Sequence, residues 1–208
     1  MRPVFFILFY CLFLSTAAQA QWSVGASAGA NTSYFQIEKI PNPIGEYTSG
    51  GRFGWQAEAM ARYTFGPRLQ LSTGLGYRQM NVNWGDCPIG CPEQVYQAAY
   101  LRLPLALDIT PTEQWFISVG AEAAWISRLP SKREEWQRYD YGLVAGAGIR
   151  ITERLQFRLS HYFGLPRVAE GRFSEEQNLL RGVYYFRNRS VQAKITYYLP
   201  LQAPISKK

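Results

Sequence analysis

The sequence predicts an all-β protein, an eight-stranded antiparallel up-and-down transmembrane β-barrel with four long external loops and three short periplasmic turns. Three observations lead to it: an N-terminal export signal, period-two alternation of apolar and polar residues in eight segments, and connections that alternate long with short. The chain has 208 residues, of which 47% are hydrophobic and 18% charged. This composition excludes a disordered chain and a coiled coil.

The N-terminal 20 residues have the form of a secretory signal peptide. Arg2 precedes an apolar run over residues 4–14, and an A-x-A site ends at Ala20, so cleavage is expected before Gln21. We therefore predict a signal peptide over 1–20, a barrel domain over 21–208, and export to the outer membrane of a Gram-negative bacterium. Later apolar runs fall short of the roughly 20 residues that a membrane-spanning helix needs.

Eight segments of the mature chain show the alternation expected of strands with one apolar face. In residues 55–65 the odd positions, from Trp55 to Phe65, are apolar, whereas Gln56, Glu58 and Arg62 occupy even positions. The first segment has the weakest pattern, and the other seven are clear. In chain order the predicted strands cover residues 22–33, 55–65, 69–78, 101–109, 115–125, 140–151, 155–160 and 190–199.

The connections between these strands determine the predicted topology. A strict alternation of long and short links places the long loops at one end of an even-stranded barrel and the short turns at the other, with both termini on the short-turn side. The predicted long loops are 34–53, 83–94, 128–138 and 166–187, and the short turns are 66–67, 110–114 and 152–154.

Two orientations of the faces are compatible with this alternation. A soluble, lipocalin-like barrel turns its apolar face inward, whereas a membrane barrel turns it toward lipid. The polar face is rich in glycine, which helps large polar side chains to fit within a narrow lumen. The apolar face carries aromatic residues near the strand ends, as interfacial girdles do. Both features favour the membrane orientation.

In the membrane orientation, ten ionisable residues are predicted to share the lumen. Unpaired charges would be costly in so narrow a space, so we interpret them as an ion network that fills the lumen. Paired carboxylates could alternatively perform acid and base chemistry. The predicted network comprises Glu58, Arg62, Arg78, Arg102, Asp108, Glu122, Asp140, Arg150, Arg158 and Lys194.

Ser160, His161 and Glu122 are the residues that could form a hydrolytic triad, as in a lipid deacylase or protease. Adjacent strand residues point to opposite faces, so Ser160 should point inward and His161 outward. His161 is also the single histidine of the chain. We therefore predict no catalytic residue and no enzymatic activity, and keep the barrel-embedded enzyme and a narrow pore as alternatives.

The loop cysteines Cys87 and Cys91 are predicted to form a disulfide in the second long loop, because the exported compartment is oxidising. The loop contains no further Cys or His that could ligate zinc, and redox pairs usually have the shorter C-x-x-C spacing. No cofactor and no metal site are predicted. In the fourth strand, Pro104 removes a ladder donor, so a bulge or gap is expected beside it.

Four segments have distinctive sequences: YLRLPL over 100–105, DYGLVAGAG over 140–148, YFGL over 162–165 and NRSVQ over 188–192. In these segments the chain resembles the small outer-membrane β-barrel domain proteins, often labelled PorT-like, of Bacteroidota. The resemblance covers nearly the whole mature chain and implies the barrel fold and an outer-membrane location. Most such proteins have no assigned role, and a minority is linked to type IX secretion or gliding. The tail after Pro200 departs from the pattern, since the last strand should end at an aromatic residue.

The sequence therefore predicts a structural or interaction protein that acts through its external loops, as an accessory to an outer-membrane secretion or surface complex. The net charge of +7 favours anionic partners. For an exported protein these are acidic lipid head groups, surface polysaccharide or other outer-membrane proteins, and not nucleic acid.

Overall fold

The computed structural model describes residues 21–40, 47–48, 50–83, 95–128, 135–173 and 182–201. All the regular structure in these ranges is β, and they contain no helix long and apolar enough to cross a membrane. Eight long strands form the barrel wall: β1 (Gln21–Ile40), β3 (Gly50–Thr64), β4 (Leu69–Asn83), β5 (Val95–Ile109), β6 (Trp115–Arg128), β8 (Tyr139–Arg150), β9 (Leu155–Gly164) and β11 (Gly182–Pro200).

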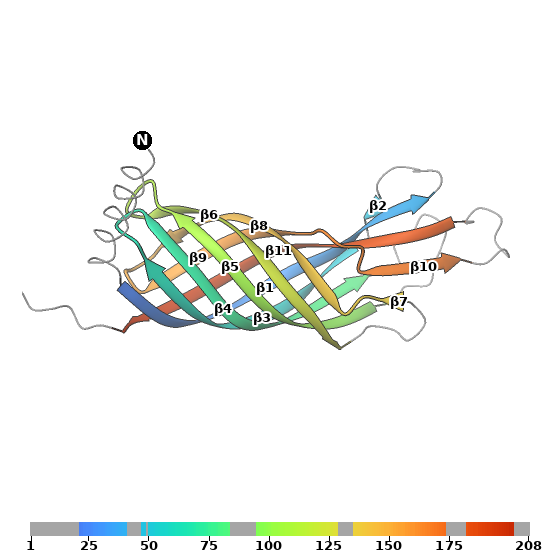
Figure 1. The fold of residues 1–208 in the computed structure, drawn as a ribbon, viewed down its shortest axis with the longest axis horizontal. Coiled ribbons are helices and arrows are strands. Elements are labelled where there is room, and N and C mark those ends of the chain that lie inside the picture. The colour runs from blue at the N-terminus through green and yellow to red at the C-terminus, as the bar shows by residue number, and fades with distance from the viewer. Residues whose placement is uncertain are drawn as a thin grey trace, which may run out of the picture.

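The wall closes because β1 pairs with β11, and every neighbouring pair in it is antiparallel. Three short strands, β2 (Tyr47–Thr48), β7 (Glu135–Trp136) and β10 (Ala169–Phe173), gather at one end of the barrel, as Figure 1 shows. The opposite end holds the short turns, the start of β1 and the end of β11. The predicted closed, eight-stranded antiparallel barrel is confirmed.

The faces of the wall have the predicted membrane orientation. Along β5, Leu105 is 49% exposed, whereas Arg102, on the inner face of the same strand, is 2% exposed. The same alternation holds along β6 and β8, where apolar side chains point outward. A belt of exposed leucine, isoleucine, valine and aromatic residues would be unfavourable in water and suits a lipid surround.

Glycines on the inner face make room for large lumen side chains. A Cβ atom at Gly76 would lie 2.5 Å from Cγ of Glu58, and one at Gly148 would lie 2.3 Å from Cζ of Phe116. Any side chain at these positions would displace its neighbour, because such contacts are far inside van der Waals distance. The glycine-rich inner face therefore serves packing, as the sequence predicted.

The strands extend further than predicted at the end where β2, β7 and β10 lie. β1 continues to Ile40, and its ladder with β11 runs without a break as far as Ile40 and Val183. Much of the predicted loops 34–53 and 166–187 is therefore strand. The sequence assignment stopped too early because the polarity of the alternating faces changes there.

The β4–β5 ladder is interrupted beside Pro104, as expected. Pairing stops after Thr73 and Leu105 and resumes at Gly76 and Arg102 in the same register. The hydroxyl of Thr73 donates a 2.9 Å hydrogen bond to the carbonyl of Pro104. The missing proline donor therefore opens a gap in the ladder without shifting the strands.

Candidate functional site

The centre of the lumen is occupied by one guanidinium group, that of Arg102 on β5. It donates hydrogen bonds to Gln56 of β3 and to Glu122 of β6, and its Nη2 lies 3.1 Å from Oε1 of Glu58. Longer contacts of 3.4 Å reach Gln192 of β11. One side chain thus links four strands around the barrel.

Two further cations complete this group. Arg78 of β4 lies 3.2 Å from Oε1 of Glu122, and its guanidinium is 5.4 Å and 5.0 Å from the ring centroids of Tyr100 and Tyr162. Lys194 of β11 contacts Glu58 at 3.2 Å. We call these residues the central lumen cluster: Gln56, Glu58, Arg78, Arg102, Glu122, Gln192 and Lys194, all of them buried.

Nearer the short-turn end, a second group of charges fills the lumen. Arg158 contacts Asp108 at 2.5 Å, and its guanidinium lies 5.2 Å from the centroid of the Phe116 ring. Arg62 stacks on Tyr198 at 3.9 Å. Half-buried Arg150 donates a 2.7 Å hydrogen bond to the hydroxyl of Thr110. Arg62 and Arg150 thus use aromatic or neutral partners where an ion network was predicted.

The remaining residue of the predicted network, Asp140 of β8, has an amide partner. The amide nitrogen of Asn188 donates to its carboxylate at 2.6 Å and lies 3.1 Å from the hydroxyl of Tyr100. The ten predicted residues therefore form separate groups within one lumen. The predicted network did not include Gln56, Asn188 and Gln192, although their even positions place them on the inner face.

The lumen is tightly filled around the central cluster. A cavity bounded by Arg102, Glu122, Ser160 and Lys194 measures about 10 Å³, which is at the lower limit for a single water molecule. Buried charges in such a space are stabilised only when their partners remain in place. Chemically, the arrangement holds carboxylates against cations, and this cavity is too small for a substrate.

Beyond the central cluster the interior becomes apolar. Tyr100 and Ile126 belong to a buried cluster inside the end of the barrel that carries the short strands, and Val168 covers it from the segment after β9. The sequence did not predict this cluster, because most of its members lie beyond the ends of the predicted strands, in predicted loops or in the short segments beside them. Its full membership is Phe35, Met80, Val82, Ala98, Tyr100, Ala124, Ile126, Val168 and Phe186.

The outward residues change polarity at the same level. Along β4 the outward series runs from Leu75 and Tyr77 to Gln79 and Asn81. Above this level the wall has an apolar inside and a mostly polar outside, which is the pattern of a barrel in water. We call this part of the wall the outer extension; it comprises residues 35–40 of β1, 79–83 of β4, 95–100 of β5, 126–128 of β6 and 182–189 of β11, with β2, β7 and β10.

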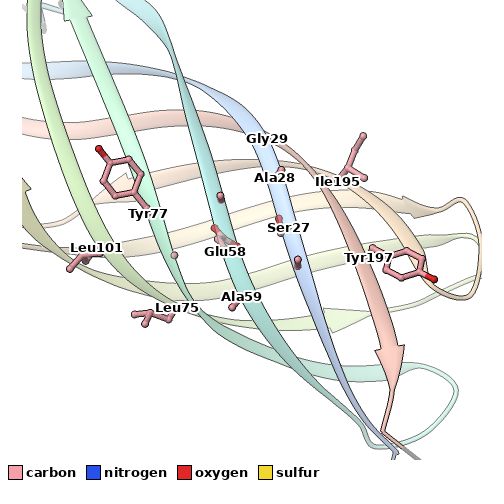
Figure 2. A pocket seen from close by; sticks show the side chains of 13 residues that line it. Ser27, Ala28, Gly29, Glu58, Ala59, Leu75, Tyr77, Leu101, Ile195 and Tyr197 are labelled. Carbon is pink, nitrogen blue, oxygen red and sulfur yellow. The ribbon is translucent and has the colours of Figure 1, made fainter. Parts of the chain in front are cut away.

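The lipid-facing surface has a hollow of about 1040 Å³ over β1 and β3. Its floor consists of small residues such as Ala28 and Ala59, and its walls are Leu75 and Tyr77 on one side and Ile195 on the other, as Figure 2 shows. Acyl chains can fill such a hollow, since its outward surface is apolar.

The residues proposed for hydrolysis do not converge. Ser160 is buried in the lumen, whereas His161 lies on the outer surface, where its Nε2 is 3.3 Å from the hydroxyl of Tyr34. Among the described residues, no group of His, Cys, Asp and Glu could hold a metal ion. Cys87, Cys91 and Ala20 lie outside the described residues, and Gln21 begins β1.

A closed antiparallel barrel with a charged, filled lumen and an apolar outer belt defines the class: this is an outer-membrane β-barrel protein of a Gram-negative bacterium. Residues 17–170 match the family model "Outer membrane protein beta-barrel domain". The chain therefore belongs to that family. No curated protein sequence matches it.

Three solved structures illustrate the likeness in fold. OprG of Pseudomonas aeruginosa is 10% identical, with 86% of this chain and 96% of that chain covered and a TM-score of 0.47. Neisserial surface protein A is also 10% identical, with 83% and 96% covered and a TM-score of 0.46. Ail of Yersinia pestis is 13% identical, with 85% and 98% covered and a TM-score of 0.43.

Proposed function

We propose that the protein is a closed barrel that conducts nothing through its lumen and works through its outer extension and external loops as an interaction protein. The observation that carries this proposal is the central lumen cluster. Arg102 joins β3, β5, β6 and β11 across the lumen, and the cavity beside it measures about 10 Å³. A narrow pore would require this buried ion cluster to separate, at high cost.

The outer extension supplies the surface for such a role. From Tyr34 to Ile40, β1 continues for roughly 20 Å along its own direction, paired with β11 throughout. A packed apolar cluster supports this wall from inside. Rigid strands can thus hold the external connections at a fixed distance from the membrane, as recognition loops on a scaffold require.

The partner class follows from location and charge. Other outer-membrane proteins and surface polysaccharide are accessible from the outer side, and the net charge of +7 favours anionic ones. The resemblance of segments such as 100–105 and 140–148 to PorT-like proteins of Bacteroidota supports a role as an accessory to a secretion or surface complex.

Two features of the exported chain belong to the same proposal. Residues 1–20 act as the signal peptide, with cleavage between Ala20 and Gln21. Cys87 and Cys91 form a disulfide that shapes the second external loop. The proposal assigns no catalytic role to Ser160, because His161 lies on the opposite face of the wall.

Conductance in planar lipid bilayers tests the closed lumen. The mature protein should give no steady conductance steps. The double variant Arg102→Ala with Glu122→Ala removes the link across the lumen and should produce them. Steady steps from the unmodified protein would contradict the proposal and support the narrow pore.

The interaction role is tested by proximity labelling in intact cells. A label attached at Gln97→Cys, exposed on the outer extension, should mark a reproducible set of surface partners. A label at Arg68→Cys, in a short turn at the opposite end, serves as the control. Identical sets from the two positions would contradict a role for the outer side.

A further inference from the structure

At the boundary between the lipid-facing belt and the outer extension, β11 carries an arginine between its neighbouring strands β1 and β9. The outward series along β11 runs from lipid-facing Val191, which is 44% exposed, directly to Arg189. Arg189 lies opposite Tyr34 on one neighbouring strand and Phe163 on the other. A cation thus stands in the row of aromatic residues that marks the end of the apolar belt.

The depth of this row matches the surface of the outer leaflet. From Trp22 to Tyr34, β1 rises roughly 40 Å, and at a strand tilt of about 45° this is roughly 28 Å along the barrel axis. The apolar belt of outer-membrane barrels is about 25 Å tall. When Trp22 lies at the periplasmic interface, Arg189 lies at the level of the outer lipid head groups.

Two more arginines lie above Arg189 and share one carboxylate. Nη2 of Arg167 lies 3.5 Å, and Nη2 of Arg187 3.4 Å, from the same Oε2 atom of Glu38. Arg167, Arg187 and Glu38 keep 39%, 37% and 43% of their side chains exposed. We call these residues the outer basic patch: Glu38, Arg167, Arg187 and Arg189.

The patch has an excess of positive charge. The hydrogen-bond acceptors of Arg189 are neutral: the carbonyl of Gly164 at 2.7 Å, the carbonyl of Asn188 at 3.3 Å and Oε1 of Gln36 at 2.5 Å. Among the side chains that the structure describes here, three guanidinium groups therefore lie near a single carboxylate, that of Glu38. Such an excess at a membrane surface attracts anionic head groups.

Aromatic rings hold the guanidinium planes in place. Arg167 lies 3.9 Å from the centroid of the Tyr185 ring, and Arg189 lies 5.7 Å from that of Phe163. Planar guanidinium groups held in this way are well suited to phosphate oxygens, which such groups can bind through paired hydrogen bonds.

We infer that the outer basic patch binds the phosphate group of an anionic lipid in the outer leaflet. Arg187 and Arg189 contact the phosphate, and Arg167, stacked on Tyr185, closes the site from above. The acyl chains lie along the apolar surface near Val191. An anionic lipid fits this patch better than an acidic protein does, because Arg189 lies at the edge of the lipid-facing belt. At that depth the barrel is surrounded by lipid head groups, whichever way it is rotated in the membrane.

The test uses the mature protein in detergent micelles, with bound lipid counted by native mass spectrometry. The probe is bis-phosphorylated lipid A, compared with the same lipid stripped of phosphate and with inorganic pyrophosphate. The intact protein should bind the phosphorylated lipid at least tenfold more tightly than the other two. Arg167→Gln with Arg187→Gln should abolish this preference.

The matched control is Arg128→Gln with Arg138→Gln, which removes two exposed arginines from another part of the outer end. It should retain the full preference. Arg189→Lys tests the deepest position separately, since it keeps the charge and loses the paired donors. If pyrophosphate binds as tightly as the phosphorylated lipid, the patch binds free phosphate. If the control variant loses the preference as the patch variant does, the lipid is attracted by net charge alone. Either result overturns the inference, as does unchanged lipid binding by the patch variant.

Discussion

The membrane-spanning part of the barrel and its outer extension are built from the same strands with opposite polarity. Below the boundary, Arg102 and Glu122 point inward and Leu105 points toward lipid. Above it, Phe35 and Ile126 fill the interior, and polar side chains cover the outside. The strands do not change direction or register along β1 and β11 as they cross the boundary.

This difference shows that the surrounding medium, lipid or water, determines which face of the wall is apolar. The alternation of side chains along a strand determines only that its two faces differ. Lipid requires an apolar exterior, so charges collect in the lumen, where they must pair with one another. Water permits a polar exterior, so the lumen can be filled by apolar packing. The point of inversion therefore marks the membrane surface along each strand.

The largest effect is expected from Arg102→Met. This variant leaves Glu58 and Glu122 buried with fewer cations, so the free energy of unfolding should fall by about 3 to 5 kcal/mol. Urea titration of the protein in lipid vesicles measures it. Arg150→Met, at the rim with the neutral partner Thr110, is the control and should cost much less. Equal losses would show that the central cluster has no special role.

A smaller loss is expected from a charge on the lipid face. Leu105→Arg and Ala121→Arg should each lower the free energy of unfolding by about 2 to 4 kcal/mol if they meet lipid. The same residue placed at Gln97, outward in the extension, should change it by less than about 0.5 kcal/mol. If all three variants assemble and resist unfolding equally, the position of the boundary is wrong.

A change in the apolar interior of the extension should have a still smaller and more local effect. Ile126→Val removes one methylene group from the buried cluster and should cost about 0.5 to 1.5 kcal/mol. Hydrogen exchange of backbone amides should become faster in the extension and stay unchanged near Arg102. Faster exchange along the whole barrel would mean that the two parts unfold as a single unit.

The smallest effect on stability is expected from the loop cysteines. Cys87→Ser with Cys91→Ser should leave assembly and the melting temperature nearly unchanged, because a disulfide across so short a segment constrains the loop and little else. It should weaken capture of partners if this loop contributes to recognition. Two free thiols in the unreduced protein would remove the basis of this prediction.

For the lumen residues, the sequence could predict the face of the barrel wall that each side chain occupies, but not the partner that it contacts. The even positions of Glu58, Arg102 and Glu122 were enough to place them in one lumen, because alternate residues of a strand share a face. It could not tell that Arg102 would be the central contact, or that Asp140 would bind Asn188. Those choices depend on the register between strands, including strands distant in sequence such as β1 and β11.

The outer extension was missed for a related reason. The alternation continues through Tyr77, Gln79 and Asn81, but the predicted strand was given one polarity throughout and therefore ended where the polarity reversed. A search for alternation with a period of two, in which either face of a strand may be the apolar one, would have found the extended strands. The outer basic patch would still have been missed, since Glu38 and Arg167 lie far apart in the chain.

The sequence by itself determined that the chain forms alternating strands, that eight of them close a barrel, and that lipid surrounds it, because local periodicity and composition encode these properties. The tertiary structure decided which charges meet, where the membrane ends along each strand, and which arginines gather at its surface. The physical reason is that pairing and depth depend on how separate strands are aligned around the barrel, and no single segment of sequence contains that alignment.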